Sequence, residues 1–375
     1  MQSLKANRAM GMLNNPYAGE LGGFGLKTYK ERAQLASSLG VTLVDLVLSQ
    51  DNAQAIRKGE NVHVRFLDGK NLSDYAFPSH SIKVVFDYAW SGSSGTCNIA
   101  DHEAVVAALS DAGARFINGP EAIRICNDKW LSYELFSELG IDTPATMRYT
   151  HANAQSLLEG SGFVFIKDTG LSEGKGQFTV SLGEGKYILK SDSSYSVFGG
   201  LGQALDTVES KANTDRCIVQ EGIKMPSIDG RVYDFRALFQ LNGDGYIVLP
   251  AVYMRFGAAG SYQSNISNGG YSMDPSRIYP DFQRIRGRME EIGIEIFKGL
   301  QRKAGDVGEI GMDFLLSSDG RLYVLEINSR SGTKGIRDLA ANSKSPEWER
   351  ALESVLRNPI AHAARIMEED SVQNR

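Results

Sequence analysis

An acidic β-hairpin between Gly311 and Asn328 constrains the fold more strongly than any other segment of the chain. The dipeptide Asp319-Gly320 is typical of a two-residue type I′ turn, because both central residues of that turn have positive φ. Counting back along the two strands from such a turn places Asp313 opposite Glu326. The sequence therefore predicts that two carboxylates meet across a strand pair.

The same register predicts that the hairpin has one apolar face, since side chains alternate between the two faces of a strand. The residues on that face are apolar at every position, namely Met312, Phe314, Leu316, Tyr323, Leu325 and Ile327. The opposite face ends in Asp313, Glu326 and Asn328. One face is thus expected to pack against a core while the other carries polar groups.

Paired carboxylates repel each other, and their burial costs still more unless one is protonated or a cation lies between them. Asp313, Glu326 and Asn328 all offer oxygen atoms, with no His or Cys beside them. Oxygen ligands favour Mg²⁺ or Mn²⁺ over zinc. The hairpin therefore predicts a magnesium or manganese site, with a solvated hairpin edge as the alternative.

The length of 375 residues predicts two or three domains. The patterns outside the hairpin predict that these domains mix α/β and α+β organisation. Residues 9–118 alternate short apolar runs with helical periods, which predicts an α/β domain with a parallel sheet. A second unit is expected over 119–222 and a third over 223–375. In the third unit the pattern predicts strands over 233–241, 246–256, 311–316 and 322–328 and helices over 282–304 and 347–367.

Composition excludes several classes of protein. A net charge of −5 provides no basic stripe for nucleic acid. The most apolar stretch, 246–254, is about half the length of a membrane span and contains Pro250. The three cysteines are far apart and the N-terminus lacks the apolar core of a signal peptide, so we expect a cytoplasmic protein that binds neither nucleic acid nor membranes.

A glycine-rich connection follows the strand that ends at Lys167. Gly170, Gly174 and Gly176 allow backbone N–H groups to turn toward an anion, and Lys167 adds a positive charge. The spacing is not that of a Walker A loop, because three residues separate the first two glycines and Gly176 replaces Ser or Thr. A polyphosphate-covering loop and an ordinary hairpin tip both remain open.

Several cations accompany these features. Lys129 lies in the first turn of a helix, where a cation is unfavourable unless an anion is nearby. The tripeptide Asp234-Phe-Arg236 places opposite charges on one strand face, and Arg255 ends the next strand before Asn265. Taken singly these residues are typical of an ordinary surface, whereas beside paired carboxylates they are typical of a clamp for phosphate transfer.

The order of these motifs resembles the ATP-grasp superfamily over roughly residues 118–340. Three segments most resemble the YheC/YheD-like branch, with RimK-type ligases as near neighbours: 217–224, 230–236 and 260–270. The resemblance implies an ATP-grasp fold preceded by an N-terminal pre-ATP-grasp α/β domain.

The resemblance also implies which residues hold ATP. Lys129 and Lys167 would contact the phosphates, beneath a closing loop that contains Gly170, Gly174, Lys175 and Gly176. The segment Gln220-Glu221-Gly222-Ile223 would hold the adenine through Glu221 and the backbone around Ile223. Asp229 would take the ribose hydroxyls.

The remaining implied roles concern catalysis. Asp313, Glu326 and Asn328 match metal ligands, with Glu326 bridging two ions. Arg236, Arg255 and Asn265 match positions that steady the γ-phosphate. The loop Arg330-Ser331-Gly332 would meet the acceptor, and Arg330 is a candidate for binding a carboxylate. Relatives often carry a proline before this glycine, and its absence weakens inference about the substrate.

The activity implied is ATP-dependent carboxylate–amine ligation, in which an amide forms through an acyl phosphate with release of ADP and phosphate. The substrates would be a small carboxylate and an amine, with an amino acid or peptide expected. A small-molecule kinase and a non-catalytic nucleotide-binding structural or regulatory protein are the alternatives. Oligomeric state stays open, although relatives are often homodimers.

Some polar features have no role in this scheme. The five histidines, expected to be structural or surface residues, are His63, His80, His102, His151 and His362. Three N-terminal segments after predicted strands either bind substrate or merely connect elements: residues 22–25, Asp87-Tyr88 and residues 91–95.

Overall fold

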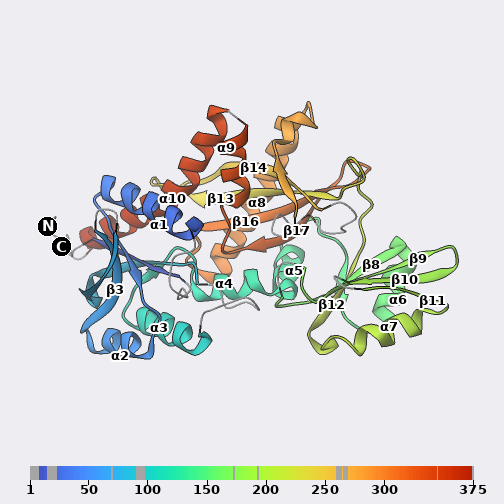
Figure 1. Ribbon diagram of the computed structural model, residues 1–375, viewed down its shortest axis with the longest axis horizontal. Helices are drawn as coiled ribbons and strands as arrows, with labels where there is room; N and C mark the ends of the chain where they lie inside the picture. The colour runs from blue at the N-terminus through green and yellow to red at the C-terminus, as the bar shows by residue number, and fades with distance from the viewer. Residues whose placement is uncertain are drawn as a thin grey trace.

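The computed structural model describes residues 8–14, 23–68, 71–89, 98–171, 174–191, 194–258, 264, 269–343 and 345–373. Three β-sheets follow one another along the chain, with helices packed on their faces (Figure 1). Within the described part, no helix is long and apolar enough to cross a membrane.

The first sheet has the strand order β4-β3-β2-β1-β5-β6. Its strands are β1 (Ala9–Leu13), β2 (Thr42–Leu46), β3 (Asn61–Asp68), β4 (Asn71–Pro78), β5 (Ile82–Asp87) and β6 (Arg115–Phe116). Strands β2, β1, β5 and β6 run parallel, which confirms the predicted α/β organisation, and β3 and β4 add an antiparallel hairpin at one edge. Its helices are α1 (Gly23–Ser38), α2 (Gln50–Lys58) and α3 (Ile99–Asp111).

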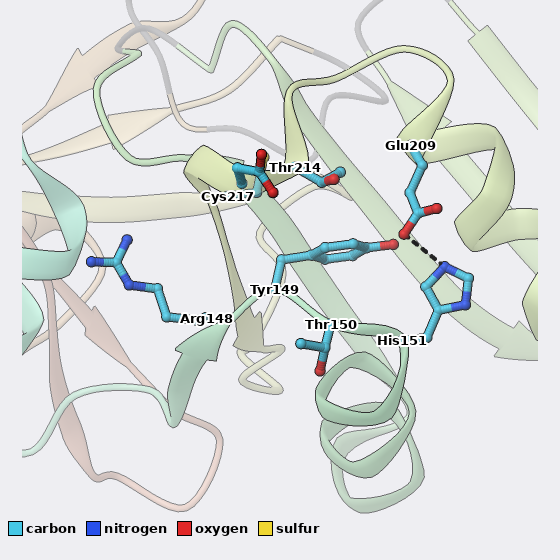
Figure 2. Close-up of a pocket in the computed structure, with 8 residues that line it drawn as sticks. Arg148, Tyr149, Thr150, His151, Glu209, Thr214 and Cys217 are labelled. Carbon is cyan, nitrogen blue, oxygen red and sulfur yellow. Dashed lines mark ion pairs between the residues drawn. The ribbon is translucent and has the colours of Figure 1, made fainter.

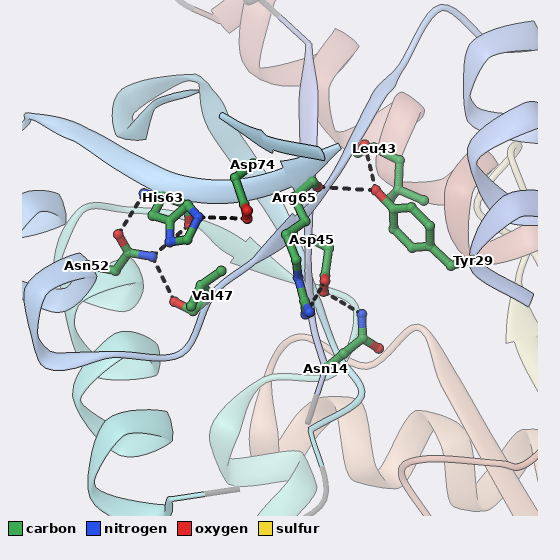
Figure 3. Close-up of polar contacts among 9 residues, drawn as sticks. All are labelled: Asn14, Tyr29, Leu43, Asp45, Val47, Asn52, His63, Arg65 and Asp74. Atoms are coloured by element: carbon green, nitrogen blue, oxygen red, sulfur yellow. Dashed lines mark hydrogen bonds and ion pairs between the residues drawn. The ribbon is translucent and has the colours of Figure 1, made fainter. Parts of the chain in front are cut away.

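Buried polar contacts attach the β3–β4 hairpin to the first sheet (Figure 3). Asp45 on β2 forms an ion pair with Arg65 on β3 and accepts a hydrogen bond of 2.7 Å from the Asn14 side chain. The Asn52 amide donates to the His63 carbonyl at 2.8 Å and accepts from the His63 N–H at 2.7 Å. These contacts add to the apolar packing of the hairpin, whose Val62, Val64 and Phe77 are buried in the core of the first sheet.

The second sheet is antiparallel throughout, with the order β11-β10-β9-β8-β12-β7. Its strands are β7 (Thr146–Arg148), β8 (Phe163–Asp168), β9 (Gln177–Gly183), β10 (Lys186–Ser191), β11 (Ser194–Phe198) and β12 (Cys217–Glu221). Helices α6 (His151–Ser161) and α7 (Leu201–Glu209) pack against it through a core that includes Leu158, Ile166 and Leu205.

The third sheet is also antiparallel, with the order β15-β14-β13-β16-β17. Its strands are β13 (Tyr233–Leu241), β14 (Ile247–Phe256), β15 (Tyr271–Met273), β16 (Glu309–Leu316) and β17 (Leu322–Asn328). The helices around it are α4 (Pro120–Asn127), α5 (Lys129–Glu138), α8 (Phe282–Ala304), α9 (Lys334–Asn342) and α10 (Pro346–Gln373). The predicted bounds of β13, β17 and α8 are confirmed.

Three helices connect units that the chain order separates. Helices α4 and α5 precede the second sheet in sequence but contribute Ile125 and Phe136 to the core of the third sheet. Helix α10 returns to the first sheet, where Ile360 and Ala363 pack with Met10 and Val84. The division into 1–118, 119–222 and 223–375 remains a prediction, and its boundaries fall between the sheets.

The turn of the β16–β17 hairpin differs from the prediction. Of the two predicted turn residues, Gly320 has a positive φ, of 82°, and Asp319 does not, so the pair does not form a type I′ turn. The Ser317 N–H donates to the Arg321 carbonyl at 2.9 Å, which makes a three-residue loop of 318–320. That loop shifts the pairing near the turn by one residue, to Leu316 opposite Leu322.

A β-bulge reverses this shift before the carboxylates are reached. The register changes between Asp313 and Phe314, so that Leu325 is the extra residue and Asp313 lies opposite Glu326 as predicted. The predicted apolar face is wrong near the turn, because Leu322 and Val324 enter the core in place of Tyr323 and Leu325. The bulge leaves Leu325 beside Glu326 instead.

Candidate active site

A small cavity lies where the second and third sheets face one another. Lys129 at the start of α5, Lys167 on β8, Gln220 on β12 and Glu326 on β17 line it together. The sequence separates these residues widely, and the packing of α5 between the sheets brings them together. The cavity has a volume of about 10 Å³, which is about the space of one water molecule.

Asp313 and Glu326 lie opposite each other beside this cavity. Asp313 is 2% exposed, and its Oδ2 accepts from Arg236 Nη2 at 3.0 Å and from Arg255 Nη2 at 2.8 Å. Burial alone would raise the pKa of Asp313, but the charges of Arg236 and Arg255 outweigh burial and hold its pKa well below the ordinary value. Asp313 is therefore ionised.

The two arginines belong to a balanced cluster of charges. Arg255 Nε donates to Asp234 Oδ1 at 2.7 Å, and Ser264 also donates to Asp234. With Arg236 and Asp313 the cluster holds two guanidinium groups and two carboxylates in buried positions. The arginines consequently face protein carboxylates in this structure and do not act as free cations.

Glu326 differs from Asp313 in its surroundings. Burial raises its pKa, and the neighbouring charge of Asp313 raises it further, while Lys129 and Lys167 act in the opposite direction. A nearby divalent cation would stabilise its ionised form. Glu326 is thus the carboxylate of the pair that most needs an additional cation.

The donor set fits Mg²⁺ or Mn²⁺. Asn328 lies two residues beyond Glu326 on β17, and its Nδ2 is buried with no hydrogen-bond partner in the described part of the chain. Its amide is therefore not committed to a protein contact through that atom, and the three side chains supply oxygen ligands of the kind these ions prefer. The ligand roles of Asp313, Glu326 and Asn328 remain predictions.

Within the described part of the chain, the hydrogen bonds of the two lysines go to neutral acceptors. Lys129 Nζ donates to the carbonyl of Asp168 at 3.2 Å and to that of Leu171, and Lys167 Nζ donates to Gln220 Oε1 at 2.8 Å. Burial lowers the pKa of both lysines, that of Lys167 to about 8, although Glu326 opposes the shift. Two half-buried cations with no direct carboxylate partner among the described residues fit a polyphosphate site.

The glycine-rich segment forms the tip of the β8–β9 hairpin, where Lys167 pairs with Gln177. Gly174 and Gly176 have φ of 77° and 65°, values that favour glycine, and Lys175 lies between them. The Gly170 N–H donates to Asp168 Oδ1 at 2.8 Å. The segment is therefore a hairpin tip by structure, and its closure over phosphate remains a prediction.

The predicted adenine segment ends β12. Glu221 is engaged with the protein, since its Oε1 accepts from the Ala145 N–H at 2.7 Å. Gly222 packs so closely on the Phe163 ring that a Cβ would lie 2.1 Å from it. Ile223 follows in an irregular segment. A contact between this segment and adenine remains a prediction.

Asp229, predicted to bind ribose, lies exposed in a tight turn. Asp229 and Gly230 have φ of 51° and 69°, and the Arg231 N–H donates to the Ile228 carbonyl at 2.9 Å. This is the type I′ geometry that the sequence analysis assigned to Asp319-Gly320. Turn geometry accounts for this aspartate, and its contact with ribose stays a prediction.

Arg330 already binds a carboxylate, one that belongs to the protein. Its Nη2 donates to Asp87 Oδ2 at 2.8 Å and its Nε to the Asp87 carbonyl at 3.1 Å. His102 Nε2 lies 2.9 Å from the same Oδ2. Arg330 therefore joins the predicted acceptor loop to the end of β5, and its predicted contact with substrate would require this pair to open.

The other predicted site residues occupy varied positions. Ser331 is buried, and its Oγ has no hydrogen-bond partner, whereas Gly332 is exposed. Asn265 lies outside the described residues, as do Gly22 and the segment 91–95.

The sequence analysis missed a buried network between the first and third sheets. The Tyr88 hydroxyl donates to Glu309 Oε1 at 2.8 Å and accepts from Arg32 Nη2 at 3.0 Å. The alternation of side chains along β16 could have placed Glu309 near the site, since Glu309 and Asp313 occupy the same face of that strand. The network anchors β16 close to the carboxylate pair.

Comparisons with known proteins agree with this arrangement. The family model described as YheC/D like ATP-grasp matches residues 123–364. The endospore coat-associated protein YheD of Bacillus subtilis (strain 168) is 24% identical over 187 residues. That alignment spans 45% of this chain and 39% of YheD, so the chain matches less than half of this relative's length.

Solved structures resemble the whole chain. The VanG D-Ala:D-Ser ligase from Enterococcus faecalis matches with a TM-score of 0.58 and 14% identity, covering 95% of this chain and 99% of that one. D-alanyl-alanine synthetase A from Vibrio cholerae O1 matches at 0.56 and 14%, covering 94% and 99%. A Chryseobacterium gregarium RiPP-associated ATP-grasp ligase, solved with ADP and a leader and core peptide, matches at 0.52 and 11%, covering 93% and 96%. These likenesses show an ATP-grasp fold. Because the family model matches most of the length of this chain, the chain belongs to the YheC/D-like ATP-grasp family.

Proposed function

We propose that this protein is an ATP-dependent carboxylate–amine ligase. The observation that carries the proposal is the pairing of Asp313 with Glu326 beside a cavity that is also lined by Lys129 and Lys167. Buried carboxylates and lysines around one small space provide the charge distribution that Mg-ATP requires. The predicted roles of the other site residues belong to the same proposal.

The proposed reaction has two steps. A substrate carboxylate oxygen attacks the γ-phosphorus of ATP, so that ADP leaves and an acyl phosphate forms. An amine then attacks the acyl carbon, phosphate leaves and the nitrogen loses a proton, which gives an amide. No covalent bond to the enzyme is needed in either step.

The residues of the chain contribute position and charge. Lys129 and Lys167 would donate to phosphate oxygens in place of the carbonyl and amide oxygens they contact now. Asp313, held by Arg236 and Arg255, would present a fixed ligand face next to Glu326. A magnesium ion bound there would neutralise charge on the transferred phosphoryl group. Closure between the sheets would exclude water that hydrolyses an acyl phosphate.

The size of the cavity adds a conformational requirement. A volume of about 10 Å³ cannot hold a nucleotide, so the second sheet or the lysine side chains must move aside when ATP enters. Movement of the second sheet would separate Lys167 and Gln220 from Glu326. The proposed enzyme therefore opens and closes during each turnover.

The substrate class is proposed from the relatives. The names of two structural neighbours describe ligases that join amino acids, and a third was solved with peptides. We therefore propose an amino acid or peptide as the acid or the amine. A cytoplasmic location, expected from the cysteines and the N-terminal sequence, and a homodimer, a state that relatives often adopt, complete the proposal.

ADP release screened against amino acids and short peptides tests the activity. Glu326→Gln is expected to lower turnover at least about 100-fold, because it removes a charged ligand from the phosphate site. The matched control is Glu121→Gln, since Glu121 is exposed and pairs with Arg124 far along α4 from the cavity. Wild-type activity in Glu326→Gln would remove this residue from the proposed metal site.

Mass analysis of the products separates the alternatives. An amide product whose mass equals the two substrates minus water supports ligation. A phosphorylated product that persists when amines are added would instead indicate a kinase. Tight Mg-ATP binding without turnover on any substrate would favour the structural or regulatory alternative, which the name of the relative YheD suggests.

A further inference from the structure

A second polar hollow lies on the second sheet, lined by residues that take no part in the proposed ligase reaction. It has a volume of about 610 Å³ and lies between the start of α6 and the end of α7. Figure 2 shows His151, Glu209 and Tyr149 turned toward one another at its edge, with Cys217 and Thr214 behind them. The sequence analysis expected His151 to be a structural or surface residue.

Three side chains at this edge offer metal ligands at close range. His151 Nε2 lies 3.0 Å from Glu209 Oε1 and 3.9 Å from Asp206 Oδ1. The ligand atoms of all three residues lie within 4.8 Å of one another, and no other group of three or more His, Cys, Asp or Glu in the described part of the chain does so. Two ligands of a tetrahedral zinc ion are about 3.3 Å apart, so small side-chain movements would close the set.

The position of the two acids on α7 also favours a cation. Asp206 and Glu209 lie one turn apart in the last turns of the helix, and no basic residue occupies its final turn. Carboxylates at a helix C-terminus are unfavourable against the helix dipole unless a positive charge compensates them. His151, the first residue of α6, faces them from the neighbouring helix.

Tyr149 supplies an independent observation. Tyr149 is 9% exposed, and its hydroxyl is buried without a hydrogen-bond partner among the described residues. Figure 2 shows this hydroxyl beside the Glu209 carboxylate. A buried hydroxyl aimed at a carboxylate is positioned as a donor to a metal-ligating group.

We propose that His151, Asp206 and Glu209 form a binding site for a divalent transition-metal ion such as Zn²⁺, supported by a hydrogen bond from Tyr149 to Glu209. One imidazole nitrogen and two carboxylates suit zinc and its neighbours better than magnesium. The open hollow leaves room for water to complete the coordination. A bound ion would join the start of α6 to the end of α7 on the outer face of the second sheet.

Zinc titration of the full-length chain, stripped of metal and free of nucleotide, tests the site. We expect one Zn²⁺ to bind per chain and to raise the melting temperature. His151→Gln and, separately, Asp206→Asn should each weaken this binding at least 100-fold while circular dichroism remains unchanged. Tyr149→Phe should keep the stoichiometry and weaken binding about tenfold.

Two control variants make the result specific. His63→Gln removes an exposed histidine that also contacts a carboxylate, at 2.8 Å from Asp74, but with no third ligand. Glu326→Gln removes a carboxylate of the proposed magnesium site. Both should bind zinc as the wild type does. Absence of zinc uptake by the wild type, unchanged uptake by His151→Gln, or an equal loss in His63→Gln would overturn the proposal.

Discussion

Asp313 and Glu326 are paired carboxylates whose surroundings shift their pKa values in opposite directions. Asp313 faces Arg236 and Arg255, which hold its pKa below the ordinary value, whereas burial and Asp313 itself raise that of Glu326. Two identical functional groups can therefore occupy opposite protonation states in one site. In the proposed ligase, a cation that enters beside Glu326 would favour its ionised form.

Close packing at a single glycine controls how the predicted adenine segment leaves the second sheet. A Cβ on Gly222 would lie 2.1 Å from the Phe163 ring, so Gly222→Ala should lower the free energy of unfolding by about 1–3 kcal/mol through overpacking. In Gly287→Ala the added methyl meets no atom within 4 Å in the middle of α8, and it should stabilise the protein by about 0.5–1 kcal/mol. Urea denaturation of both variants measures the contrast. An unaffected Gly222→Ala would show that Phe163 moves aside freely.

At the scale of elements, long and strongly patterned segments could be predicted from sequence. Helix α8 and strands β13 and β17 have the predicted bounds, because each combines a clear apolar period with turn signals at its ends. Helix α4 was missed, since Pro120 was interpreted as a boundary although proline is favoured at the first turn of a helix. Strands β3, β4, β10 and β11 were also missed, although polar and apolar residues alternate in β3 from Asn61 to Phe66, so the period-2 signal was overlooked there.

The hairpin shows how a correct pairing of two carboxylates can follow from an incorrect turn. The predicted two-residue turn and the observed three-residue loop differ by one position, and the bulge at Leu325 removes that difference before Asp313 is reached. Nothing in the local sequence announces the bulge, because Leu325 fits either face. The pairing of the carboxylates was therefore predictable, whereas the residues of the core face were not.

The bulge itself can be tested by deleting Leu325. Without this residue the register set by the loop continues unbroken, so Asp313 still lies opposite Glu326, and Val324 and Ile327 keep their core positions. We expect a change of only about 1 kcal/mol in the free energy of unfolding, but at least a tenfold loss of ATP turnover, because the bulge aims Glu326 at the cavity. Equal turnover with and without Leu325 would show that the bulge has no role in the site.

At the scale of the molecule, contacts between distant segments hold the sheets together, and these were beyond prediction. Arg330 and Asp87 are separated by 243 residues along the chain, and their pairing depends on the packing of the first sheet against the third. The same applies to Arg8 on the first sheet and Glu368 on α10, 2.8 Å apart. Sequence spacing contains no signal for such pairs, since neither residue lies in a local motif with its partner.

Asn118 joins the first and third sheets at the point predicted as a domain boundary. Its Nδ2 donates to the carbonyls of Glu309 and Ser329 at 2.7 and 2.6 Å, and its Oδ1 accepts from the N–H groups of Gly308 and Glu309 at 3.1 and 3.2 Å. Asn118→Ala leaves these backbone groups buried and unpaired, so the free energy of unfolding should fall by about 3 kcal/mol. Thermal denaturation measures the loss. A shift as small as that of Asn153→Ala, a half-buried control whose amide donates one hydrogen bond, to the Arg148 carbonyl, would contradict this role.

His362 on α10 makes the stability of the same junction depend on pH. Burial lowers its pKa from 6.5 to about 4, Arg365 and Arg115 oppose its protonation further, and Asp306 alone acts in the other direction. Above pH 6.5 the imidazole is neutral whether the chain is folded or unfolded. As the pH falls from 6.5 toward 4, the unfolded chain gains a proton that the folded chain does not, so stability is lost over this interval, by about 3 kcal/mol in full.

The variant His362→Gln removes this contribution. Urea denaturation should show a flatter dependence of its unfolding free energy on pH between 6.5 and 4, whereas the exposed control His63→Gln should keep the dependence of the wild type. Parallel pH profiles for wild type and His362→Gln would mean that the folded state takes up the proton as readily as the unfolded chain, and that α10 does not shield this imidazole at the junction.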